Sequence, residues 1–159
     1  MKKLNLGTLM LFVLGSEILG SIGSIFTIPS IKSWYIFLQK PPFTPPNWVF
    51  GPAWGILFLL MGIAAYLVWA KGYQKKDVKH ALNIFIIQFG FNILWSVVFF
   101  GLQSPLFGFI EIVVLWLLIR ETYLKFKQID ELAGYLLLPY LVWVTFASYL
   151  NFGVMMLNR

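Results

Sequence analysis

Five long apolar runs, separated by short polar or proline-rich stretches, dominate the chain. They cover residues 4–28, 48–70, 80–102, 106–124 and 132–157. Each run is close to the roughly 20 residues that an α-helix needs to cross the hydrocarbon core of a bilayer. The pattern therefore predicts an all-α membrane protein, a bundle of five transmembrane helices that forms a single domain over residues 1–159.

Polar and aromatic side chains recur at helical spacing inside two of these runs. The third run places Gln88, Asn92, Trp95 and Ser96 on one helical face, and the fifth places Tyr140, Trp143, Ala147 and Asn151 on one face. Such side chains are costly toward lipid, so both faces should point into the bundle. From spacing alone they serve equally well as contacts between helices or as the lining of a cavity.

The segment 29–47 differs from every other connection in the chain. It contains Pro41, Pro42, Pro45 and Pro46, and proline excludes a continuous helix there because it lacks an N–H and restricts the preceding residue. Large aromatic residues flank and occupy this stiff loop, where small polar residues are usual. Aromatic rings bind flat apolar molecules well. We therefore expect the loop to be a lid over a binding cavity.

Composition supports the membrane assignment, since 60% of the 159 residues are hydrophobic and 11% are charged. The net charge of +6 is spread over the ends of the spans, which is typical of membrane topology rather than of nucleic-acid binding. Nine basic residues fall on one side, namely Lys2, Lys3, Lys71, Lys75, Lys76, Lys79, Arg120, Lys125 and Lys127. Three fall on the other, namely Lys32, Lys40 and Arg159. The N-terminus should therefore be cytoplasmic and the lid external.

Several kinds of chemistry are excluded by the residues present. The chain has no cysteine, and neither a nucleophile–base pair nor a phosphate-binding loop is recognisable. Its single histidine, His80, follows Lys79 at the cytoplasmic edge, so we expect an interfacial residue rather than a haem ligand. No metal site and no resident cofactor is expected.

Two acidic residues interrupt the apolar runs. Glu17 lies midway in the first run, where it is either a proton or cation site or, more simply, a neutral or hydrogen-bonded glutamate facing protein. Glu111 lies near the outer end of the fourth run and should reach the interface, so no role is assigned to it. Small residues at four-residue spacing, Ser16, Gly20 and Ser24 in the first run and Gly51 and Gly55 in the second, are typical of close helix contacts.

Three blocks of this sequence resemble the TspO/MBR family, which comprises tryptophan-rich sensory proteins and the translocator protein or peripheral benzodiazepine receptor. The first is W-Y-x-x-L-x-K-P-x-F-x-P-P-x-W-V-F-x-P-x-W, from Trp34 to Trp54. The second runs from Gln88 to Trp95 and on to Gly101, and the third from Leu138 through Trp143 to Asn151. Outside these blocks the chain resembles the family only in general character.

The resemblance implies a receptor or carrier for a flat hydrophobic ligand, with a tetrapyrrole such as protoporphyrin IX as the expected one, and also a pocket for drug-like molecules. It also favours the interpretation that the polar faces of the third and fifth runs line a cavity under the first loop. The expected ligand-binding residues are Trp34, Tyr35, Phe43, Trp54, Gln88, Asn92, Trp95, Ser96, Tyr140, Trp143, Ala147 and Asn151. The alternative is an enzyme that degrades porphyrin with light and oxygen, for which Trp34 and Trp143 would be the reactive side chains.

The resemblance also bears on partners and location. Translocator relatives carry an L/V-x-Y-x-K/R sterol motif at the end of the fifth helix, but here Phe152 replaces the tyrosine and the next basic residue is Arg159. We therefore expect weak or no cholesterol binding. A homodimer is compatible with the family, and the expected home is a bacterial plasma membrane, with the mitochondrial outer membrane as the alternative.

The predicted orientation can be tested by labelling. A cysteine introduced at Thr44 should react in intact cells with a membrane-impermeant maleimide, because the basic residues place the first loop outside. Labelling that appears only after cell lysis would reverse the orientation and the placement of the lid.

Overall fold

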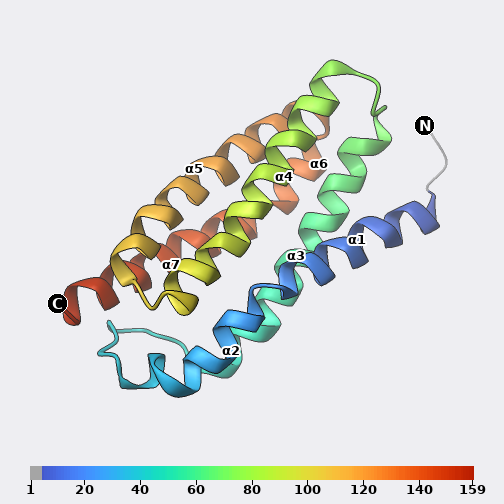
Figure 1. The fold of residues 1–159 in the computed structure, drawn as a ribbon. Helices are drawn as coiled ribbons and strands as arrows, with labels where there is room; N and C mark the ends of the chain where they lie inside the picture. Colours follow the sequence, from blue (N-terminus) through green and yellow to red (C-terminus); the bar gives the residue numbers. More distant parts are fainter. Residues whose placement is uncertain (1–4) are drawn as a thin grey trace.

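The computed structural model describes residues 5–159, and this part of the chain contains helices and no strands. The helical elements are α1 (Leu6–Ser21), α2 (Ser24–Ser33), the 3₁₀ turn η1 (Tyr35–Phe37), α3 (Asn47–Ala70), α4 (Lys76–Ser96), the π-helical segment η2 (Val97–Gly101), α5 (Pro105–Ile129), α6 (Glu131–Leu136) and α7 (Leu138–Leu157). They form an elongated bundle (Figure 1). The expected start of the first span at Leu4, together with Lys2 and Lys3, lies outside the described residues.

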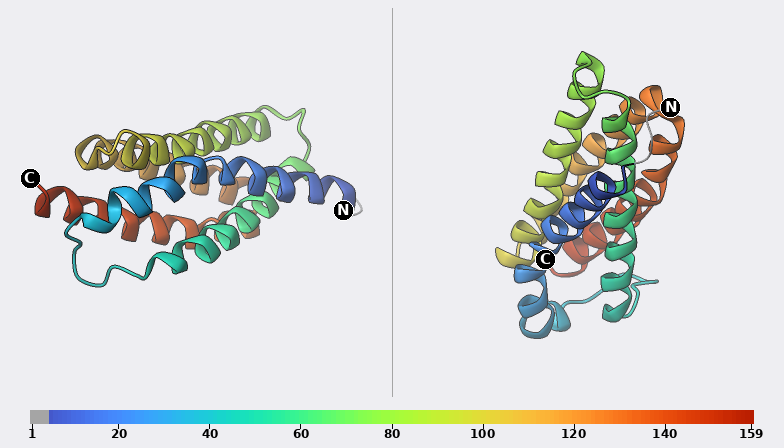
Figure 2. Two further views of the ribbon diagram at one scale, coloured as in Figure 1. Left: turned by 60° about the horizontal axis from the view of Figure 1, so that its bottom comes forward. Right: turned by 90° about the vertical axis from the view of Figure 1, so that its right-hand side faces the viewer.

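Four helical segments are long and apolar enough to cross a membrane: Leu6–Ser33, Asn47–Ala70, Lys76–Gly101 and Glu131–Leu157. The other long helix, α5, is not among them, and it carries Glu111, Arg120 and Glu121. The described chain begins and ends at opposite ends of the bundle (Figures 1 and 2). The C-terminus shares its end with the loop 38–46, and we call this the lid end.

The first helix does not stop at Pro29 as expected. Instead it is interrupted earlier, at Ile22 and Gly23, and resumes as α2, which contains Pro29 and runs to Ser33. At the interruption the Ile22 N–H bonds to Leu19 O at 3.2 Å, a tighter pairing than that of an α-helix. Transmembrane helices tolerate proline where neighbouring groups adjust, so the missing N–H does not end this helix. The irregular lid is correspondingly shorter than the expected 29–47.

Helix α3 contains a second proline away from its expected place. The helix begins at Asn47, so Pro52 lies in the second turn rather than the first.

The last expected span is divided at Leu137 into α6 and α7. Pro139 lies in the first turn of α7, where a backbone N–H would have no partner within the helix.

Helix α1 packs along α3 through its small residues. A Cβ atom at Gly62 would come within 2.7 Å of the Val13 Cα atom, and one at Gly20 would overlap the Phe58 ring. At the end away from the lid, the Asn5 N–H donates to the Tyr66 hydroxyl at 2.9 Å. Ser16 and Gly20 are buried, in agreement with the spacing of small residues in the sequence. These contacts hold the first pass directly against the second.

The buried core lies between α3, α4, α5 and α7. Its fully enclosed side chains include Met61, Ile119, Phe126 and Val144. The Phe85 and Phe126 rings stack with 5.6 Å between their centroids, which ties α4 to α5.

Two polar residues enter this core without a partner. The expectation that Glu111 reaches the interface is wrong, because the residue is 8% exposed and neither carboxyl oxygen has a hydrogen-bond partner among the described residues. The helix turns this side chain inward, since α5 packs between α4 and α7. Gln88 is 1% exposed, and its amide oxygen and nitrogen are likewise unpartnered within residues 5–159.

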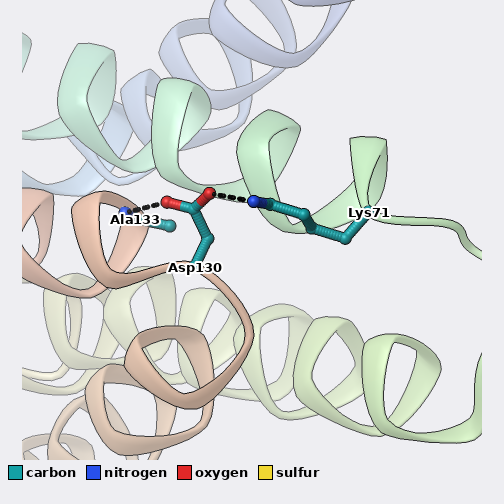
Figure 3. Close-up of polar contacts among 3 residues, drawn as sticks. All are labelled: Lys71, Asp130 and Ala133. Atoms are coloured by element: carbon teal, nitrogen blue, oxygen red, sulfur yellow. Dashed lines mark hydrogen bonds and ion pairs between the residues drawn. The ribbon is translucent and has the colours of Figure 1, made fainter. Parts of the chain in front are cut away.

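An ion pair closes the bundle at the end away from the lid. Asp130, between α5 and α6, accepts from Lys71 Nζ at 2.7 Å and from the Ala133 N–H at 2.9 Å (Figure 3). Burial alone would raise the pKa of the Asp130 carboxyl, but the bonds from Lys71 and Ala133 and the lysine charge outweigh it and hold the pKa below its usual value. Asp130 therefore caps α6 while it fastens α6 to the end of α3.

We expect Asp130→Ala to lower the free energy of unfolding by about 1 to 2 kcal/mol, because it removes both a helix cap and an ion pair. Asp130→Asn keeps an acceptor for the Ala133 N–H and should lose less. The pKa of Asp130 in the folded state lies below the unfolded value of about 3.9. The contribution of this carboxylate to the free energy of unfolding is therefore complete at neutral pH and is lost as the pH falls below about 4. Thermal melts in detergent across this pH range provide the measurement.

The matched control is Glu121→Gln, since Glu121 and Lys125 form a more exposed pair at 3.7 Å. That variant should melt like the parent. Equal stability of Asp130→Ala and the control at neutral pH would contradict a structural role for Asp130.

Candidate functional site

A cavity of about 460 Å³ opens between the first three passes and α7, toward the lid end. Its wall takes residues from α1, α2, η1, α3, α4, η2 and α7. Most of the lining is apolar or aromatic, as is typical of small-molecule sites. Helices α5 and α6 contribute none of it, so the cavity and the main core lie side by side in the bundle.

The space comes partly from two glycines of α3. A Cβ atom added at Gly51 or Gly55 would meet nothing within 4 Å, and both residues line the cavity. The prediction that this pair marks a close helix contact is therefore wrong. The glycines leave open space instead, because α1 approaches α3 only further along, around Phe58 and Gly62.

Aromatic rings form one side of the cavity. Trp54 lies edge to face against Trp143, with 6.5 Å between ring centroids, and Phe50 lies 5.9 Å from Trp143 in the same manner. On the α4 side, Trp95 stacks on Phe99 at 5.2 Å. The rings pack against one another, which orders them before any ligand arrives.

Hydrogen bonds hold the polar lining residues in place. Asn151 accepts from the Trp95 indole N–H at 3.1 Å and donates to the Pro105 carbonyl at 2.8 Å. Asn92 donates to the Tyr140 hydroxyl at 2.9 Å. Since Asn151 uses both ends of its amide on protein groups, its first role is to join α4, α5 and α7.

One fully buried polar atom among the described lining residues has no such bond. The Trp143 indole N–H is buried and has no acceptor among the described residues. A buried donor without an acceptor costs about 1 to 3 kcal/mol of free energy. A ligand could bring an acceptor to this N–H only after the side chains that cover it had moved.

Eight of the twelve expected site residues line the cavity: Tyr35, Trp54, Asn92, Trp95, Ser96, Trp143, Ala147 and Asn151. The other four do not. Trp34 packs edge to face against Phe99 at 5.6 Å, and Tyr140 is buried behind Trp54. Gln88 lies in the core, while Phe43 is 88% exposed, with a left-handed φ of 64°.

The lid is attached to α7 rather than inserted into the cavity. The Asn158 side chain exchanges two hydrogen bonds with the Gln39 backbone, both at 2.9 Å, and the Tyr149 hydroxyl donates to the Pro42 carbonyl at 3.1 Å. Residues 38–46 contribute nothing to the lining, which is supplied by Tyr35, Asn47 and Trp48 at the two edges of the loop. In this conformation the aromatic rings of residues 38–46 therefore do not face the cavity, in contrast to the expectation that they would contact a ligand.

Sequence reasoning missed the wall formed by the first pass. Glu17, Gly20, Ser21, Gly23, Ser24, Thr27, Ile28 and Ile31 line the cavity from α1, α2 and the turn between them. Glu17 and the small residues stand out in the sequence of the first run. Helical spacing, however, does not show which neighbouring helix or cavity a given helical face meets. His80 is exposed at the start of α4, away from the cavity, and residues 5–159 contain no cluster of potential metal ligands.

Comparison with known proteins agrees with this architecture. The family model described as TspO/MBR family matches residues 12–157. The tryptophan-rich protein TspO of Archaeoglobus fulgidus is 43% identical over 155 residues, which cover 98% of this chain and 99% of that protein. The tryptophan-rich protein TspO of Chlorobaculum tepidum is 48% identical over 140 residues (87% and 88%), and the Homo sapiens translocator protein is 36% identical over 135 residues (84% and 79%). The chain therefore belongs to the TspO/MBR family.

Proposed function

We propose that this protein is a membrane receptor or carrier that binds a flat, mainly apolar ligand, a tetrapyrrole such as protoporphyrin IX, in the cavity between α1, α2, α3, α4 and α7. The observation that carries the proposal is a largely apolar and aromatic cavity of about 460 Å³ with a few polar side chains in its lining. Ligand sites span about 300 to 1,000 Å³ and combine apolar walls with a few polar groups. The name of the human relative, translocator protein, favours transport as the biological role.

The membrane arrangement is part of the same proposal. Helix α5 completes five crossings, with Glu111 turned inward and Arg120 and Glu121 in its C-terminal half, and the N-terminus is cytoplasmic. In a bacterial plasma membrane the cavity would then open toward the outer side. An apolar ligand would enter past Trp48 and Asn47, which lie at the edge of the lid.

A second candidate function is photochemical degradation of the bound pigment. The pair of Trp54 and Trp143, with 6.5 Å between ring centroids, favours it, because closely spaced indoles can donate electrons to an excited pigment. Trp34, the other expected reactant, lies outside the lining, against Phe99. Any reactive role in the cavity would therefore fall to Trp143 and its neighbour.

One titration separates the two functions. Purified protein is titrated with protoporphyrin IX in darkness by tryptophan quenching and is then illuminated in air. Saturable quenching without loss of pigment supports a receptor or carrier, whereas pigment loss in proportion to protein supports the enzyme. Absence of saturable quenching would contradict both.

The glycines of α3 offer a test of the cavity itself. Gly55→Leu should weaken protoporphyrin IX binding at least about tenfold while the melting temperature stays near that of the parent, because the added side chain enters open space. Gly62→Ala is the contrasting variant. Its extra carbon would meet the backbone of α1, so it should destabilise the fold by about 1 to 3 kcal/mol. A Gly55→Leu protein that melts early but binds normally would place the ligand elsewhere.

Trp143 and Trp69 form a second matched pair. Trp143→Phe should weaken protoporphyrin IX binding by about 1 to 2 kcal/mol, or about five- to thirtyfold, through lost stacking area and the lost indole N–H. Trp69 packs against Phe12 and Tyr66, outside the cavity lining, so Trp69→Phe should leave affinity unchanged. Equal losses in both would indicate general damage to the bundle. Under illumination at saturating pigment, degradation that stops in Trp143→Phe identifies that indole as a reactant.

A further inference from the structure

The described residues that line the cavity include one acidic side chain and no basic one. Glu17 contributes the carboxyl group, and this lining contains no lysine, arginine or histidine. The remaining polar lining groups are hydroxyls, amides and indole N–H groups. The lining therefore contains a potential negative charge and no positive one. An ionised Glu17 would lie in largely apolar surroundings, which screen its charge weakly.

Glu17 lies at the end of the cavity farthest from the lid. Helix α1 runs antiparallel to α3 (Figure 1). Val13 lies beside Gly62, and Gly20 lies beside Phe58. Glu17 falls between these two levels of α1. Tyr35 and Asn47 line the opposite, lid end. We call the Glu17 end the inner end of the cavity.

The carboxyl group of Glu17 is not used by the described part of the protein. It is half-buried and makes no hydrogen bond or ion pair with any residue from 5 to 159. The neighbouring hydroxyls of Ser21, Ser24 and Thr27 donate to the carbonyls of Ile18, Ser21 and Gly23, at 2.7, 2.5 and 3.1 Å. A hydroxyl has one proton to donate, so these three have none left for Glu17.

We propose that Glu17 makes the inner end of the cavity selective for a ligand group that is positively charged or donates an N–H hydrogen bond. The inference rests on the proposed function, because it concerns the ligand of the same cavity. The cavity lining also contains the rings of Trp54 and Phe58, and aromatic faces favour a cation as well. A carboxylate on the ligand would be repelled from the inner end and would turn toward the lid.

The lid end has the complementary charge. Lys40 Nζ lies 4.8 Å from the centre of the Tyr35 ring, and Tyr35 lines the cavity there. A ligand with polar groups along one edge would therefore bind in opposite orientations according to the charge of that edge. A cationic edge points inward to Glu17, and an anionic edge points outward toward Lys40.

The test uses three ligands with the same macrocycle: protoporphyrin IX, its dimethyl ester, and its diamide with two terminal ammonium groups. Affinities are measured in darkness, at neutral pH and in an uncharged detergent. The parent protein should bind the ammonium derivative about tenfold more tightly than the ester, as a hydrogen bond to a charged group allows. Glu17→Gln should abolish this preference and change the affinities of the ester and the diacid less than about twofold.

Two further variants complete the experiment. Glu17→Asp keeps the charge and should keep the preference, while Glu121→Gln removes an acidic group outside the cavity and should behave like the parent. The inference would be overturned if Glu17→Gln weakened the binding of all three ligands equally. It would also be overturned if Glu17→Asp lost the preference for the ammonium derivative as completely as Glu17→Gln does.

The result also separates this inference from the function on which it rests. Saturable binding of the ester by the parent protein without any preference for the ammonium derivative overturns the selectivity and leaves the proposed receptor standing. Failure of the parent protein to bind any of the three macrocycles overturns both.

Discussion

The close contact between α1 and α3 around Gly62 and Gly20 is the constraint on which the rest of the structure depends. In lipid, helices gain little from burying apolar surface against one another, so close backbone approach through small residues has to hold them together. Gly62 allows the α1 backbone to lie against α3, and Gly20 receives the Phe58 ring. Beyond this contact the two helices separate, and Gly51 and Gly55 face open space. The cavity begins where the packing ends.

The two ends of the bundle are closed in different ways. Away from the lid, the charged pair of Lys71 and Asp130 joins α3 to α6. At the lid end, the loop is attached to α7 through Asn158 and Tyr149, by bonds to backbone groups. The loop is therefore held against the C-terminal part of α7 by hydrogen bonds.

Two buried amides hold helices in register, and two unpartnered groups at the cavity carry the functional argument. Asn151 and Asn92 use their amides on Trp95, Pro105 and Tyr140, which connects α4, α5 and α7. By contrast, the Trp143 N–H and the Glu17 carboxyl group have no partner among the described residues of the protein. One donor and one acceptor therefore remain without a partner, the donor buried on α7 and the acceptor half-buried on α1. The proposed ligand is defined by those two groups as much as by its flat shape.

Apolar run length and helical spacing are local properties, and they were enough to predict the helical membrane class, four of the five expected spans and eight residues of the cavity wall. They could not predict which neighbour each helical face meets. Gln88 and Asn92 lie one turn apart, yet one enters the core and the other the cavity; Glu111 is turned inward, and Phe43 is turned outward. Pro29 lies within its helix instead of ending it. Two pairs of small residues look alike in sequence, but only the distance between α1 and α3 decides that Gly20 closes a contact while Gly55 leaves a cavity.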